Sequence, residues 1–102
     1  MKVENSEIIG VAVMALAVDQ SPDDQALTER FLAALDALDK RAKVGYMLAY
    51  KLLSGERYGI TTDNPESVRR ARSIAADLGA TIQELEQDDG MTQMVFAPAV
   101  KS

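Results

Sequence analysis

Apolar residues recur at helical spacing through the first half of the chain, from Leu27 to Leu53. At 100° per residue they fall within an arc of about 100°, which is typical of one buried helix face. Ser21, Pro22 and two aspartates come just before, and these residue types favour a helix start. We therefore predict one helix over residues 22–54, ended by Gly55, with Gly45 or the charged stretch Asp39-Lys40-Arg41 as the places where so long a helix would bend. Its apolar positions are Leu27, Phe31, Ala34, Leu35, Leu38, Ala42, Gly45, Ala49, Leu52 and Leu53.

The second half of this predicted helix is apolar on more than one side. Val44, Met47, Leu48 and Tyr50 lie around the stripe rather than on it. A helix that is apolar on most sides must be covered on most sides, either by the rest of the fold or by a second copy. We predict that these four residues form a homodimer interface, so that Leu48→Asp or Tyr50→Asp gives a folded monomer.

The second half of the chain predicts a short strand, a helix and a hairpin. Residues 57–62 are typical of a strand, and Asn64 and Pro65 then favour the start of a helix over about 65–78, with Gly79 at its C-cap. Residues 81–87 and 91–97 flank an Asp-Asp-Gly turn signal. The buried face of this second helix is expected to hold Val68, Ala71, Ile74, Ala75 and Leu78.

Residues 8–18 form an uninterrupted apolar run whose structure decides the order of the elements. Its β-branched residues favour a strand covered on both faces, whereas its Ala, Met and Leu content also permits a buried helix. We favour the strand, which gives an α+β fold: a small two-layer sandwich of order β-α-β-α-β-β. The alternative is a helical N-terminal half plus a βαββ unit. With 102 residues, the chain is expected to form a single domain over 1–102.

The chain contains no cysteine and no histidine, which limits its chemistry. Ser-His-Asp and Cys-His hydrolases and thiol carriers are excluded, as are the usual zinc ligands. The acidic pairs of the sequence fall at helix starts, on exposed helix or strand faces and in a turn. We therefore expect a protein that is not an enzyme and that uses no cofactor or metal.

The net charge of −5 is unevenly distributed, with bases in excess only over residues 40–72. An acidic total argues against nucleic-acid and membrane partners. The run over residues 8–18 is too short to span a bilayer, and acids rather than bases precede it. Together with the absence of cysteine, this predicts a cytoplasmic protein.

The string Thr62-Asp63-Asn64-Pro65-Glu66, followed by Gly79 and by Glu86-Gln87-Asp88-Asp89-Gly90, resembles the second half of the TusA/SirA-like sulfur-carrier family. The resemblance implies a strand, a helix and a hairpin with an acidic turn. Ser21-Pro22 stands where that family carries its Cys-Pro motif. Because serine cannot carry a persulfide, the resemblance implies a topology and no activity.

Two functions follow from these patterns. The first is a non-enzymatic interaction or assembly protein, homo-oligomeric through the long helix or bound to another protein. The alternative is a small-molecule or anion-binding module with a pocket between the first helix and the sheet. The start of the second helix, with Arg69 nearby, is a candidate anion site. The expected pocket residues are Tyr46, Tyr50, Tyr58, Thr62 and Arg72.

Overall fold

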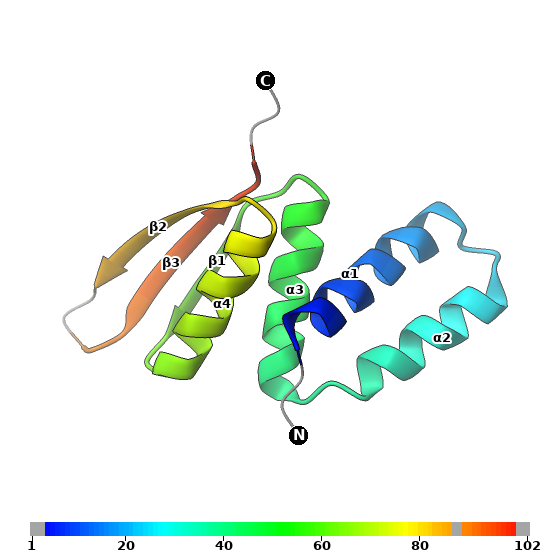
Figure 1. Cartoon of the computed structure of the whole chain (residues 1–102), viewed down its shortest axis with the longest axis horizontal. Helices are drawn as coiled ribbons and strands as arrows, with labels where there is room; N and C mark the ends of the chain where they lie inside the picture. The colour runs from blue at the N-terminus through cyan, green and yellow to red at the C-terminus, as the bar shows by residue number, and fades with distance from the viewer. Residues whose placement is uncertain (1–3, 87–88, 100–102) are drawn as a thin grey trace.

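The computed structural model describes residues 4–86 and 89–99, and within them the chain forms four helices and one three-stranded sheet (Figure 1). The α+β class predicted from the sequence is confirmed. The molecule is flat, with extents of 47 × 38 × 18 Å. The elements are α1 (Asn5–Gln20), α2 (Gln25–Asp36), α3 (Lys40–Leu53), β1 (Tyr58–Thr62), α4 (Pro65–Asp77), β2 (Thr81–Glu86) and β3 (Thr92–Ala97).

The strand predicted over residues 8–18 is wrong, because this run lies in helix α1. Its buried residues are Ile8, Val11, Ala12 and Ala15, a helical spacing that the alternation of a strand does not give. A helix satisfies its own backbone groups, so the run needs no neighbouring strand. The alternative of a helical N-terminal half plus a βαββ unit is the arrangement found.

The single helix predicted over residues 22–54 is also wrong, because the chain breaks between α2 and α3. Asp39 caps α3, its Oδ1 accepting a hydrogen bond of 2.8 Å from the backbone N–H of Ala42. The start of α2 differs as well: Asp24 is its N-cap, whereas Ser21 closes α1. The apolar stripe passes through the break because Leu38, in the connection, stays buried.

From residue 58 onward the order of elements agrees with the prediction. The sheet has the order β1-β3-β2, and β3 is antiparallel to both neighbours. Ile60 lies opposite Met94, and Ile82 lies opposite Phe96. Asn64 caps α4 as expected, and Leu78 and Gly79 end it. The predicted hairpin forms, although residues 87–88 of its turn lie outside the described part of the chain.

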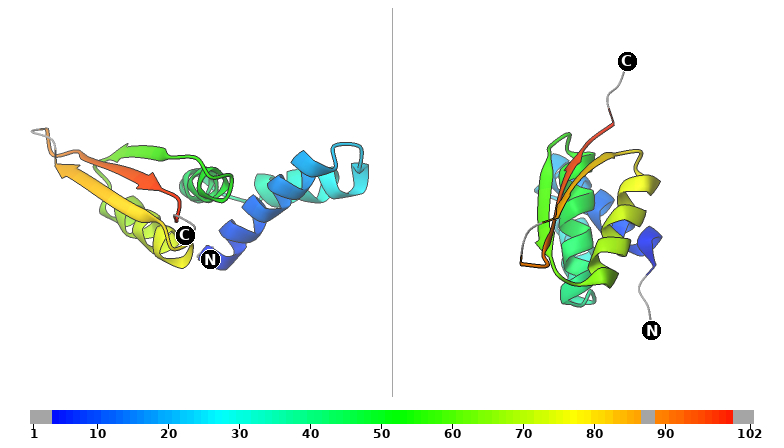
Figure 2. Two further views of the ribbon diagram at one scale, coloured as in Figure 1. Left: turned by 90° about the horizontal axis from the view of Figure 1, so that it is seen from above. Right: turned by 90° about the vertical axis from the view of Figure 1, so that its left-hand side faces the viewer.

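Helices α3 and α4 cover one face of the sheet, as the right-hand view of Figure 2 shows. The core between them includes Leu48 from α3, Ile74 from α4, and Met94 and Phe96 from β3, all 0% exposed. On the far side of α3 lie α1 and then α2 (Figure 1). Helix α3 therefore packs between the sheet on one side and the other N-terminal helices on the other.

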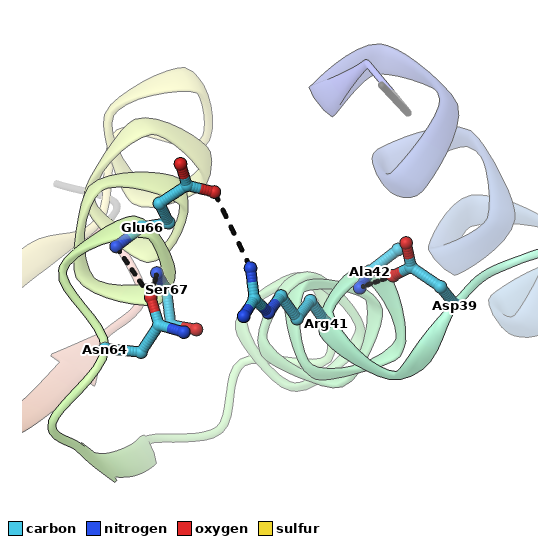
Figure 3. Close-up of polar contacts among 6 residues, drawn as sticks. All are labelled: Asp39, Arg41, Ala42, Asn64, Glu66 and Ser67. Atoms are coloured by element: carbon cyan, nitrogen blue, oxygen red, sulfur yellow. Dashed lines mark hydrogen bonds and ion pairs between the residues drawn. The ribbon is translucent and has the colours of Figure 1, made fainter. Parts of the chain in front are cut away.

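Three helices meet at Gly45. A Cβ atom at this position would lie 2.8 Å from Cδ1 of Ile74 in α4 and 3.5 Å from Cγ2 of Ile8 in α1. The absence of a side chain thus allows α3 to approach both neighbours closely. Two polar contacts join α4 to its neighbours at the same junction. Asn5 Nδ2 of α1 donates a hydrogen bond of 2.6 Å to Ser73 Oγ. Arg41 of α3 forms an ion pair of 3.6 Å with Glu66 (Figure 3).

Candidate functional site

An open groove of about 750 Å³ lies between α2 and α3. Its edge is formed by Leu32 of α2, whose exposed fraction is 54%, the largest among the exposed large apolar side chains of the described residues. None of the twelve residues of α2 is buried. The groove is lined by Leu32, Ala33, Leu35, Asp36, Lys43, Tyr46 and Met47.

A row of aromatic rings connects the three N-terminal helices beside this groove. The ring of Phe31 in α2 lies 6.1 Å from that of Tyr46, which in turn stacks on Tyr50 at 6.2 Å. The Tyr50 hydroxyl donates a hydrogen bond of 2.6 Å to Oδ2 of Asp19 at the end of α1. Aromatic pairs at these distances add to the energy of burial. Of these three rings, Tyr46 is the one that lines the groove.

Charged side chains flank the groove with opposite signs on its two helices. Asp36 belongs to α2 and Lys43 to α3, and both are exposed. Neither makes an ion pair with any residue that the structure describes. The groove therefore presents an apolar centre with one acidic and one basic edge, which is the composition of a docking surface.

The two tyrosines differ in the cause of their shifted acidity. The hydrogen bond to Asp19, followed by desolvation, raises the pKa of Tyr50. Desolvation, followed by the Asp19 charge, raises the pKa of Tyr46. In both cases the folded state favours the neutral phenol. Asp19 thus keeps the hydroxyl that joins α1 to α3 protonated.

These shifts predict an alkaline limit to stability. Because the folded chain holds the Tyr50 proton more tightly than the unfolded chain does, its contribution is complete below about pH 10 and is lost as pH rises through the raised pKa. Tyr50→Phe should make the fall in unfolding free energy between pH 9 and 12 shallower, as measured by urea titration. Asp19→Asn should act in the same way. An unchanged slope in both variants would show that this contact does not form.

The four residues predicted as a homodimer interface do not share one environment. Val44 and Met47 are 43% and 36% exposed, but Leu48 is fully buried in the core of its own chain. Tyr50 is half-buried. Its ring stacks on that of Tyr46, and its hydroxyl donates a hydrogen bond to Asp19. The part of the prediction that concerns Leu48 is therefore wrong, because α4 and the sheet cover that side of the helix. Of the four, only Met47 lines the groove.

The five residues predicted to line a pocket are likewise spread over the fold. Only Tyr46 lines the groove. Tyr58 and Thr62 stand at opposite ends of β1, and Arg72 pairs with Glu84 on β2. The space predicted for the pocket, between the helix and the sheet, holds the buried side chains of Leu48 and Phe96.

The predicted anion site at the start of α4 is already occupied by the chain itself. Oδ1 of Asn64 accepts hydrogen bonds from the backbone N–H groups of Glu66 and Ser67, at 2.9 and 3.3 Å (Figure 3). The Glu66 carboxylate also lies at this helix end and pairs with Arg41. The backbone N–H groups of Glu66 and Ser67, which would hold an anion there, already have a partner in Asn64.

The groove residues Leu32, Asp36 and Lys43 are absent from the predictions made from the sequence. Leu32 carries the one signal that points to them: it lies about 140° from Leu27 around the helix, outside the apolar stripe. A leucine on the polar side of a helix is not needed by the core. A docking surface is one reason for its presence there.

Over residues 4–86 and 89–99, no group of three or more acidic side chains is arranged to hold a metal ion. In the same residues, no helix is both long and apolar enough to cross a membrane.

The chain matches no family model, no curated protein and no solved structure. The resemblance to the TusA/SirA-like family therefore stays a prediction.

Proposed function

We propose that this protein is a non-enzymatic assembly module that associates with a second copy of itself through the groove between α2 and α3. The observation that carries the proposal is an entire helix, α2, without a buried residue, beside an open apolar groove. Phe31, Ala34 and Leu35 pack against the core with only partial burial, so a partner that covers the exposed side of α2 adds to its stability.

The exposed apolar residues favour a protein partner over a small molecule. A binding pocket for a small molecule encloses most of its ligand. This groove instead stays open between Leu32 and Met47, which are 54% and 36% exposed. An open apolar groove between two helices suits a third helix laid along it. The apolar circumference predicted for residues 44–53 supports the same surface at Met47.

Helix α1 adds to this support. No polar side chain interrupts residues 8–18, yet four residues of α1 are buried and Val13 is 52% exposed. The N-terminal half of the chain thus carries more apolar surface than its own fold covers. Val13 and Leu32 are the two most exposed large apolar side chains of the described residues, and both lie in this half of the chain, which supports an interaction surface there.

The mass of the protein in solution tests the proposal. Light scattering behind size-exclusion chromatography, over a hundredfold range of concentration, should give twice the 11.1 kDa of the chain. Leu32→Asp should shift the protein to a monomer at concentrations where the wild-type chain is dimeric, with at least a hundredfold weaker association. A charge buried without a partner in an interface has an effect of this size.

Leu85→Asp is the matched control, since Leu85 on β2 is 51% exposed and the substitution is chemically the same. It should leave the mass of the dimer unchanged. Circular dichroism checks that both variants keep the helical content of the wild type. A wild-type monomer at every concentration, or equal loss of mass in both variants, would contradict the proposal.

A further inference from the structure

We infer that α2 of a second copy fills the groove between α2 and α3, and that the two copies meet reciprocally about a twofold axis. The inference rests on the proposed self-association and adds which surfaces meet. Each copy contributes α2 and α3 to a four-helix arrangement, and Leu32 of each copy enters the groove of the other. Reciprocal contact of one patch with itself is the rule for twofold dimers.

The shape of the groove matches a helix face of this same chain. The groove is bordered by Tyr46 and Met47, and its volume of about 750 Å³ accommodates several side chains of one helix face. Leu32 is the most exposed large apolar side chain of α2, at 54%. The same helix therefore provides one wall of the groove and the side chain that fits a neighbouring groove.

The exposed face of α2 carries negative charge. Glu29 and Asp36 lie three residues before and four residues after Leu32, which places all three on one side of the helix. Both acids are exposed, and neither makes an ion pair with another described residue. The protruding leucine is thus flanked by negative charge.

The facing helix α3 carries the opposite sign. Lys40 and Lys43 lie seven and four residues before Met47, again on one side of the helix. They too are exposed and make no ion pair within the described part of the chain. A helix in this groove therefore meets the α3 side best with acidic side chains next to its apolar centre.

Helix α2 of this chain meets that description, which favours a second copy over a different protein. In the twofold arrangement Asp36 pairs with Lys43 of the second copy, and Lys43 pairs with Asp36 of the second copy. Each contact occurs twice, so the charges contribute twice to the choice of partner and of register. Within one chain the same charges gain nothing.

Charge reversal tests this pairing. Lys43→Glu and Asp36→Lys, made separately, should each weaken the dimer about tenfold, because like charges then face one another at two places. The double variant, Asp36→Lys with Lys43→Glu, should regain a dissociation constant within about threefold of the wild type. Arg57→Glu, an equal change of charge outside both helices, should have no effect. Sedimentation velocity over a dilution series gives the constants.

The salt dependence of the wild type provides a second measurement that needs no variant. Its dissociation constant should rise as ionic strength increases from 0.05 to 0.5 M, because exposed ion pairs are screened. A dimer that dissociates with Leu32→Asp but is not restored in the double charge variant would overturn the reciprocal pairing and leave the proposed self-association standing. A wild-type monomer would overturn both.

Discussion

Leu48→Asp is expected to unfold the chain rather than to give a folded monomer. The Leu48 side chain is 0% exposed. Loss of a buried leucine side chain alone costs about 2–5 kcal/mol. A carboxylate without a partner at the same place adds the cost of removing its charge from water. A domain of this kind has an unfolding free energy of about 5–15 kcal/mol. The two costs together therefore remove most or all of that free energy.

Far-UV circular dichroism and urea titration at pH 7 measure this loss. Leu53→Asp is the matched control, five residues away on the same helix, because the Leu53 side chain is 38% exposed and does not line the groove. It should leave the unfolding free energy within about 1 kcal/mol of the wild type. A folded, monomeric Leu48→Asp protein would instead support the interface predicted from the sequence and would contradict the packing described for α3.

Gly45→Val is expected to reduce the unfolding free energy by about 1–3 kcal/mol, because it overfills the junction of three helices. The new Cβ atom would lie 2.8 Å from Ile74 Cδ1 and 3.5 Å from Ile8 Cγ2. Both isoleucines are 0% exposed, so any movement that makes room for the new side chain takes place inside the packed core. Relief requires the Ile74 side chain to turn or α3 to shift, and either change disturbs the packing between α3 and α4.

Gly10→Val provides the comparison, since Gly10 also lies in a helix but has no atom within 4 Å of an added Cβ. It should change the unfolding free energy by no more than about 0.5 kcal/mol. Urea titrations at low protein concentration separate this effect on folding from any effect on association. Equal changes in the two variants would show that the close approach at Gly45 does not determine stability.

The second half of the fold could be predicted from the sequence because its signals are local. Asn64 and Pro65 start α4, and Gly79 follows its end, as their backbone preferences require. The pattern of Ala71, Ile74 and Ala75 identified its buried face. Each of these features depends on residues only a few positions apart, so a neighbouring segment has little influence on them.

The first half could not be predicted in the same way, because its outcome depends on distant contacts. β-Branched residues in 8–18 favour a strand, but α1 packs on α3 and its packing outweighs that preference. The break between α2 and α3 kept the helical phase, so the periodicity of the stripe did not reveal it. The cap at Asp39 was its only local sign, within a segment of ordinary helix-forming residues.

The candidate site shows the same limit. An apolar surplus around residues 44–53 pointed to α3, and Met47 does line the groove. Leu48 looked equivalent to Met47, because a single sequence does not tell which side of a helix its own chain will cover. The other wall of the groove comes from Leu32 in α2. A groove between Leu32 and Met47 can form only because α2 and α3 are two separate helices, and the sequence pattern had predicted a single one.

The position of β3 has a consequence for synthesis of the chain on the ribosome. This strand lies between β1 and β2, which run in the same direction, yet it emerges after both. Until residues 92–97 leave the exit tunnel, the two earlier strands have no hydrogen-bonding neighbour and the core lacks Met94 and Phe96. The sheet therefore closes in one late event, and a chain that stalls before that segment exposes the apolar undersides of α3 and α4 to chaperones.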